Sequence, residues 1–260
     1  MPPSFPESID MSVLSFVLDL LLGVVLGVTG GLFGIGGGLI AIPILGLFFG
    51  LDQQMAQGTA LVMVVPNVVL AVWRYNQHNR IDLTHAAALA VPGFICAYFG
   101  SQWAVNLPPD LMRIGFAFFL LALAVYMLIR LLRGSATGGT TLRHGLPALA
   151  ALGAVAGVMG GLMAVGSAVV ATPGLTGIFG ASQVVAQGLS LALALPSTCV
   201  TLIVYAWHGQ VDWMLGVPLA IGGLLSISWG VKLAHTLPER LLRGLFCGFL
   251  AICAVALYLK

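Results

Sequence analysis

The chain alternates long apolar runs with short polar breaks. The first half has runs at residues 12–28, 36–50, 55–75, 84–105 and 111–132, and the second at 146–165, 166–180, 184–206, 213–233 and 241–259. Eight of these runs are long enough for helices that cross the roughly 30 Å hydrocarbon core of a membrane. The runs 36–50 and 166–180 would rise only ~22 Å as helices. The pattern therefore predicts short, broken or re-entrant helices at these two places.

The two halves of the chain repeat one another in a single ungapped register. Val28 to Pro43 reads VTGGLFGIGGGLIAIP, and Val158 to Pro173 reads VMGGLMAVGSAVVATP. From Gly27 to Pro66, 17 of 40 residues are identical to the residue 130 places further on, where chance would give roughly four. The sequence therefore predicts two homologous repeats of about five hydrophobic segments each, at 1–132 and 146–260, joined by a linker at 133–145.

Composition places the chain among integral membrane proteins. Hydrophobic residues make up 60% of the chain, charged residues 7%, and the mean hydropathy is +1.08, far above the range of soluble proteins. The helical length of the runs makes the expected fold all-α. The four cysteines lie in apolar runs without the spacing of a metal or redox site, so we expect no disulfide, metal or cofactor. The first ten residues hold no Lys or Arg, so we interpret them as a mature start instead of a signal peptide.

Basic residues indicate how the repeats are oriented. If the two short segments do not cross the membrane, the ten Lys and Arg divide six to four between its two sides. If they do cross, eight share one side, and only Arg113 and Lys260 lie opposite. The positive-inside rule favours the second arrangement. It makes the two repeats inverted and puts both termini outside the cytoplasm.

The glycine runs are candidates for an anion site. A broken helix exposes backbone N–H groups at its N-terminal end, where the helix dipole adds positive potential, and transporters place such breaks near the bilayer midplane in matching positions of two repeats. Close packing of membrane helices is the alternative role for these glycines. The candidate residues are Gly30, Gly31, Gly34, Gly36, Gly37, Gly160, Gly161, Gly166 and Ser167.

Polar side chains in the run after each short segment are further candidates. Gln57-Gly58 and Gln187-Gly188 match in the repeat, and each pair precedes a proline of its helix. Amides inside a membrane can donate hydrogen bonds to a ligand, and Asn67 joins this set. Thr59, Ser190, Ser197 and Thr198 are weaker candidates because hydroxyls can bond to the preceding helical turn. Since every Lys and Arg falls at a segment end or in a loop, we expect neutral donors to bind the anion.

Asp19 is the one carboxylate well inside a predicted span. An acid embedded in a membrane is a candidate site for a coupled proton. Its counterpart in the repeat is Leu149, so the repeat does not support the assignment. Asp82 and Asp212, with nearby histidines, lie in loops, where capping is the simpler role.

The run GVTGGLFGIGGGLIAIPIL and its second copy resemble the duplicated domain of the TauE/SafE family of sulfite exporters. The Gln-Gly pair that follows each short segment also resembles this family. The resemblance covers almost the whole chain and implies a transporter of the bacterial inner (plasma) membrane for sulfite, organosulfonates or related small anions. The second copy departs from the first, with Ala164 for Gly34 and Ser167-Ala168 for Gly37-Gly38, so the two halves cannot offer identical contacts.

Other functions stay open from the sequence. A passive anion channel or a carrier of small carboxylates could use the same architecture. An intramembrane hydrolase would need Ser167 and His208, but the residues around Ser167 match the Gly-x-Ser-Gly loop of such enzymes poorly. A structural subunit would have no use for paired broken helices. We therefore expect a secondary transporter working by alternating access between the repeats, not an enzyme, and small transporters of this kind often form homodimers.

Overall fold

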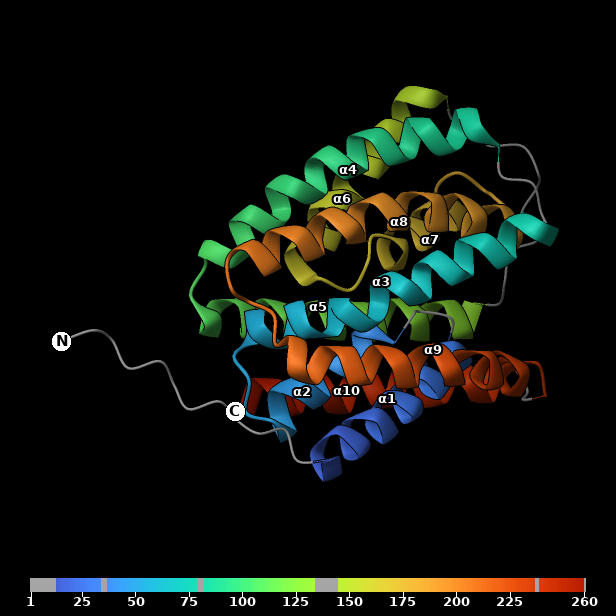
Figure 1. Cartoon of the computed structure of the whole chain (residues 1–260). Helices are drawn as coiled ribbons and strands as arrows, with labels where there is room; N and C mark the ends of the chain where they lie inside the picture. The colour runs from blue at the N-terminus through green and yellow to red at the C-terminus, as the bar shows by residue number, and fades with distance from the viewer. Residues whose placement is uncertain (1–12, 34–36, 79–81, 134–144, 237–238, 260) are drawn as a thin grey trace.

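Helices account for nearly all of the chain that the structure describes. The computed structural model describes residues 13–33, 37–78, 82–133, 145–236 and 239–259. Within these ranges it contains α1 (Val13–Phe33), α2 (Gly38–Phe48), α3 (Gln53–His78), α4 (Leu83–Asn106), α5 (Pro109–Arg133), α6 (Leu146–Met163), α7 (Ala168–Gly177), α8 (Gln183–Trp207), α9 (Trp213–Thr236) and α10 (Glu239–Leu259) (Figure 1).

The expected all-α membrane fold is confirmed. Among the described residues, seven helices are long and apolar enough to cross a membrane, namely α1, α3, α4, α5, α6, α8 and α9. The segments expected to be short are short: α2 has 11 residues and α7 has 10. The boundary that differs most from the prediction is the end of the first helix. Helix α1 does not stop at Val28 but continues through Gly30 and Gly31 to Phe33, because a helical glycine costs only about 1 kcal/mol relative to alanine and both residues are buried in the fold.

Local sequence explains where several helices start and where two of them lack a backbone hydrogen bond. The Asp82 carboxylate caps α4 by accepting hydrogen bonds from the backbone N–H groups of Thr84 and His85, and the Ser182 hydroxyl caps α8. Long helices α3 and α8 each carry an internal proline, Pro66 and Pro196. Because proline has no backbone N–H, each of these helices lacks one backbone hydrogen bond near its middle.

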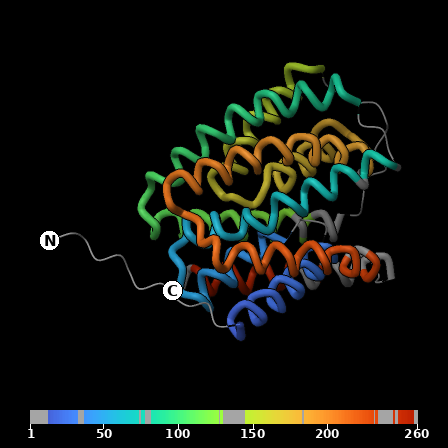
Figure 2. Tube along the Cα trace, viewed as in Figure 1, coloured from blue at the N-terminus to red at the C-terminus, as the bar shows by residue number. Residues whose placement is uncertain are grey.

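The first helix of each half packs against the fourth helix of the other half. A Cβ atom placed on Gly23 of α1 would lie 2.5 Å from the carbonyl oxygen of Leu219 in α9, and one on Gly153 of α6 would lie 2.1 Å from that of Leu89 in α4. The two contacts are counterparts of each other in the repeat. Figure 2 shows the blue α1 beside the orange α9 and the green α4 beside the yellow α6. The halves are therefore interleaved, not side by side.

Contacts along the helices give their relative directions. Gln57, near the start of α3, meets Tyr205, near the end of α8, and Tyr75, near the end of α3, meets Val184, near the start of α8. Helices α3 and α8 are therefore antiparallel. Helices α3 and α9 make contacts whose residue numbers rise together. Thr59, near the start of α3, contacts Asp212, just before α9, and Asn67, further along α3, lies by Gly223, further along α9. These two helices are parallel.

Helix α1 also runs parallel to α9, as shown by contacts of Gly23 with Leu219 and of Gly230 with Val28. Since α1 and α3 then share one direction, α2 must carry the chain back between them. These are the directions that inverted repeats require. The ends of α3, α5 and α9 and the starts of α4, α6 and α10 lie together on the right of Figure 1. We call this the basic end, because eight of the ten Lys and Arg residues belong to these helix ends and their loops.

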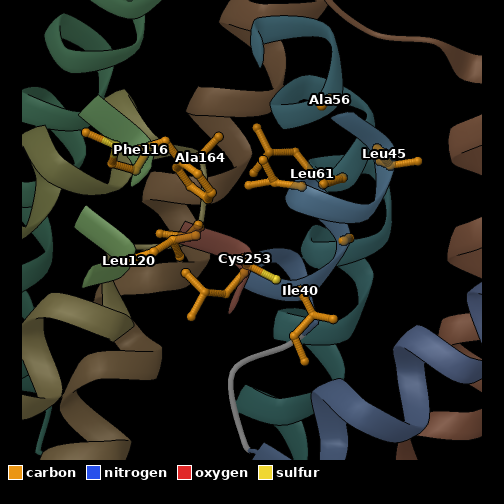
Figure 3. Packing of buried hydrophobic residues seen from close by; sticks show 14 of the residues in the cluster. Ile40, Leu45, Ala56, Leu61, Phe116, Leu120, Ala164 and Cys253 are labelled. Carbon is orange, nitrogen blue, oxygen red and sulfur yellow. The ribbon is translucent and has the colours of Figure 1, made fainter. Parts of the chain in front are cut away.

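A hydrophobic core surrounds the short helix of the first half. Figure 3 shows Ile40 and Leu45 of α2 with Leu61 of α3, facing Phe116 of α5 and Ala164. All five residues are at most 2% exposed. The core thus joins the glycine motif of one half to the motif of the other.

Reporter fusions test the inverted arrangement. A reporter inserted after Asn79 and one inserted after Gln210 are expected to lie on opposite sides of the membrane, with Asn79 in the cytoplasm, because basic residues gather around the first site. Paired alkaline phosphatase and fluorescent protein fusions measure this directly. Both sites on the same side would contradict inversion.

Candidate functional site

Each short helix begins beside the middle of the long helix that follows it. A Cβ atom on Gly38, the first residue of α2, would lie 2.6 Å from a methyl carbon of Val64, midway along α3. In the second half, the Ser167 hydroxyl just before α7 donates a hydrogen bond to the Ser197 hydroxyl, midway along α8, over 2.7 Å. Both short helices therefore start in the interior, next to the prolines of α3 and α8.

The two short helices also start close to each other. A Cβ atom on Gly38 would lie 4.0 Å from the carbonyl oxygen of Ala164, which follows α6. Gly37 and Gly166 turn the chain into α2 and α7 with φ angles of 87° and 85°. L-residues with side chains rarely adopt this conformation, so glycine is required at both turns. We call this meeting point of the two motifs the central site.

The central site is polar without being charged. Asn67 and Ser197 are counterparts in the repeat, and with Ser167 and Thr198 they are at most 1% exposed. Within the described part of the chain, no buried side chain belongs to Lys, Arg, Asp or Glu. The positive potential available there comes from the N-terminal ends of α2 and α7. Such a place can hold a small anion by backbone N–H groups and hydroxyls.

The glycine candidates fall into different structural classes. Gly30, Gly31, Gly160 and Gly161 lie inside α1 and α6, where helical hydrogen bonds engage their backbone N–H groups. Gly161 also has a packing role, because a Cβ atom there would lie 2.3 Å from the carbonyl oxygen of Ala97 in α4. Gly34 and Gly36 lie outside the described residues. Of the glycines predicted to bind substrate, Gly37 and Gly166 are the ones that lie at the central site.

Gln57 and Gln187 are counterparts in the repeat, but one side chain is buried and the other is exposed. Gln57 is 0% exposed, and its Oε1 accepts a hydrogen bond of 2.8 Å from the Tyr205 hydroxyl. Its Nε2 has no hydrogen-bond partner among the described residues. Gln187 is exposed. Neither glutamine lies at the middle of its helix, so the structure places both away from the central site.

The glycines after these glutamines touch different neighbours. A Cβ atom on Gly58 would overlap the carbonyl oxygen of Gln210, in the loop before α9. One on Gly188 would lie 2.5 Å from the ring of Tyr75. Both glycines therefore permit a close approach at opposite ends of the α3–α8 pair, and neither offers a free surface to a ligand.

Ionised groups lie toward the ends of the helices. Asp19 is partly buried, four residues before Gly23 on α1, and its charge interacts with that of Asp212 at the start of α9. It is therefore level with the first turn of α9, not with the central site. At the basic end, the hydrogen bond from His85, aided by the backbone N–H of Thr84, holds the pKa of the Asp82 carboxylate below its usual value. In the described ranges, no three His, Cys, Asp or Glu residues come together as metal ligands.

Two tyrosines that link the halves were not among the candidates chosen from the sequence. Tyr205 bonds to Gln57, and Tyr75 donates a hydrogen bond to the carbonyl oxygen of Val184. The repeat contained a signal, since Tyr75 matches Tyr205 just as Gln57 matches Gln187. The sequence could not show that each tyrosine serves the other half.

Comparisons with known proteins indicate the family of the chain. Residues 19–257 match the family described as "Sulfite exporter TauE/SafE". The chain belongs to the TauE/SafE family. It is 26% identical over 218 residues to the "Probable membrane transporter protein YdhB" of Bacillus subtilis, covering 82% of this chain and 88% of that protein. A "Probable membrane transporter protein" of Xylella fastidiosa is 28% identical over 237 residues, 88% of each chain.

A third relative, "Probable membrane transporter protein MJ0441" of Methanocaldococcus jannaschii, is 31% identical over 104 residues, 38% of this chain and 39% of that protein. TauE/SafE membership and the seven apolar helices make the chain a multi-pass protein of the inner membrane, related to membrane transporters. The resemblance in the glycine motifs is thus confirmed at the level of the family.

Proposed function

We propose that this TauE/SafE protein is a secondary transporter of small sulfur-containing anions, such as sulfite or an organosulfonate, and that it binds them at the central site. The observation that carries the proposal is that α2 and α7 both begin beside the middles of α3 and α8, close to one another. An anion there would receive backbone N–H groups from both repeats. Gly37, Gly166, Asn67, Ser167 and Ser197 are the residues we assign to it.

Neutral donors suit a transporter. Each hydrogen bond to a charged group contributes about 1.5–3 kcal/mol, so a few of them hold an oxyanion while still allowing it to leave. A buried Lys or Arg would bind more tightly and release more slowly, and the described interior holds none. The asymmetry between Gly37 and Ser167 gives the site a hydroxyl on one side only.

An inverted arrangement of the two repeats would supply a route for alternating access. The antiparallel α3 and α8 contact each other at both ends, and rocking of one repeat against the other would expose the central site to each side in turn. The buried contact between Gln57 and Tyr205 favours a carrier over a permanently open channel. A carrier of small carboxylates is the alternative with the same geometry. Asp19 stays our candidate for proton coupling, and a homodimer stays part of the proposal.

An enzymatic role has little support in the geometry. The Ser167 hydroxyl donates to Ser197, and the His208 ring bonds to the carbonyl oxygen of Val204. His208 follows α8, about 16 Å of helix beyond Ser197, so it cannot serve as a base for Ser167. A hydrolase would need nucleophile and base within hydrogen-bond reach.

Thermal stability measurements test the substrate class. Purified protein in detergent is expected to be stabilised by sulfite, or by one of thiosulfate, taurine and sulfoacetate, because a ligand at 100 times its dissociation constant adds about 2.7 kcal/mol. Sulfate, acetate and chloride at equal ionic strength are the controls. If only carboxylates stabilise the protein, its substrate is a small carboxylate and not a sulfur-containing anion. If none of these anions stabilises it, the result contradicts anion binding at the central site.

A further inference from the structure

Two buried amides at the start of α3 lack hydrogen-bond partners, at the end of the molecule opposite the basic end. Gln53 is 4% exposed and Gln57 is 0% exposed. The side-chain Nε2 of each makes no hydrogen bond within the described part of the chain. A buried donor without a partner destabilises a fold, and native proteins usually satisfy such a group with ordered water, an ion or a ligand. The two amides therefore indicate a site that a bound molecule completes.

The two amides lie on the same face of α3. They are four residues apart, so their side chains are neighbours across one helical turn. Side chains of a helix lean toward its N-terminus. The first backbone hydrogen bond of α3 runs from the N–H of Ala56 to the carbonyl oxygen of Asp52, so the preceding N–H groups have no acceptor within the helix. Two side-chain amides and a helix N-terminus are thus close together, and all of them offer donors.

Neighbouring hydrogen bonds hold this turn of α3 in place without using the two donors. The Gln57 Oε1 accepts a hydrogen bond of 2.8 Å from the Tyr205 hydroxyl, on the side of the amide away from its Nε2. The Gln54 amide donates to the carbonyl oxygens of Ala104 and Leu107, at the end of α4, over 3.3 and 2.7 Å. These bonds fix the first turn of α3 and leave the two unpaired amide nitrogens for a ligand.

The repeat duplicates the pair of amides. Gln183 and Gln187 stand at the corresponding positions at the start of α8, at the basic end. A Gln-x-x-x-Gln pair therefore begins the long middle helix of each half, at opposite ends of the molecule. Such placement is expected of groups that meet the anion on each side of a transporter built from inverted repeats.

Charged side chains at the Gln53 end lie at the surface or near it. The Asp52 carboxylate is exposed, so water and salt screen it. Arg113, near the start of α5, is 27% exposed and bonds to the exposed Asp110 over 3.0 Å, and its Nε is buried without a partner among the described residues. Leu107, which Gln54 holds, comes two residues before α5. Arg113 thus adds positive potential near the start of α3.

We propose that Gln53, Gln57 and the N-terminus of α3 form an outer anion site, which binds the transported anion between the central site and the outside. This inference rests on the proposed function. The ligand is a small oxyanion because the unpaired groups are donors, and an oxyanion offers acceptors alone. The site serves the side outside the cytoplasm, because the positive residues gather at the other end of the molecule.

The outer anion site and the central site are in series. Val64 lies beside the start of α2, and Gln57 is seven residues earlier on α3, or about 10 Å along the helix. The Tyr205 hydroxyl also approaches the carbonyl oxygen of Leu162 at 3.4 Å, and Ala164, two residues further on, borders the central site. Two anions at this spacing repel each other. An ion in one site therefore favours release from the other, as in ion pathways with adjacent sites.

Methionine variants test the outer anion site, because methionine keeps the length of glutamine but has no amide. Gln53→Met removes an unpaired buried donor, so it should raise the midpoint of thermal unfolding without ligand by about 2–4 °C. It should also weaken sulfite binding at the outer anion site at least tenfold. A gain in stability together with a loss of binding is expected of a binding residue and not of a structural one.

Gln54→Met is the matched control. Gln54 is adjacent in the chain and equally buried, at 3% exposed, but its amide is bonded to two carbonyl oxygens. Its variant keeps the backbone N–H, so it should lower the unfolding midpoint and leave sulfite binding unchanged. Gln57→Met should weaken sulfite binding as Gln53→Met does. It should also lower the midpoint, since Tyr205 loses its acceptor.

Equilibrium dialysis with radiolabelled sulfite counts the sites on the full-length protein in detergent. At saturation, the unaltered protein should bind two sulfite ions and Gln53→Met one, and the double variant Ser167→Ala with Ser197→Ala should keep the ion of the outer anion site. If the unaltered protein and Gln53→Met each bind one ion, and the serine variant loses it, the proposed function stands but water occupies the amides. No bound sulfite in any variant would overturn both proposals. A lower midpoint for Gln53→Met would show that its amide already has a partner, and would also contradict the outer anion site.

Discussion

A single methyl group added at Gly157 is expected to destabilise the protein severely. A Cβ atom there would lie 2.2 Å from the carbonyl oxygen of Gly93, where α6 crosses α4. Backbone atoms cannot move aside as a flexible side chain can, so the two helices must separate. Overpacking of this kind typically costs about 1–3 kcal/mol and sometimes more. Gly157→Ala should therefore lower the midpoint of thermal unfolding by several degrees or abolish folded protein, as measured by fluorescence-detected size exclusion after heating.

Matched glycines make the test specific. Gly27→Ala should behave like Gly157→Ala, because a Cβ atom there would lie 2.5 Å from the carbonyl oxygen of Gly223. Gly248→Ala in α10 should instead raise the midpoint of thermal unfolding. Its Cβ position has no neighbour within 4 Å, and alanine favours a helix by up to about 1 kcal/mol over glycine. Equal stability of all three variants would show that these glycines do not hold the interleaved helices together.

The second large effect is expected at the central site. Ser197→Ala removes a buried hydroxyl beside the start of α7, and should weaken apparent anion affinity roughly tenfold to a hundredfold if that hydroxyl contacts the bound anion. Ser167→Ala should show a similar loss. Both are measured as the shift of the ligand concentration that gives half-maximal thermal stabilisation.

Ser226→Ala is the matched control for these variants. Ser226 is equally buried and bonds to the carbonyl oxygen of Gly222 on its own helix, but it lies where α9 packs on α1. Its variant should keep wild-type affinity. Unchanged affinity in both Ser167→Ala and Ser197→Ala, with loss in an arginine variant such as Arg113→Gln, would place the substrate elsewhere.

Several features follow from the sequence because they depend on composition and spacing alone. Helix lengths follow from the apolar runs, and α2 and α7 are short because their runs are short. The repeat follows from identities such as Gln57 with Gln187 and Pro66 with Pro196. The family follows from the paired glycine motifs. Each of these features can be found within one segment of the sequence or by comparing two segments directly.

Tertiary structure alone decided which glycines serve packing and which turn the chain. Gly161 and Gly37 look alike in a glycine run, but one faces the backbone of α4 and the other turns into α2 with a positive φ. It also decided that Tyr205 of one half closes on Gln57 of the other, while Gln187 stays exposed. Such differences arise from contacts between segments that are far apart in the sequence. The two copies already differ in sequence at many positions, but for residues that are identical in both, such as Gln57 and Gln187, the packing of the halves against each other makes their environments unequal.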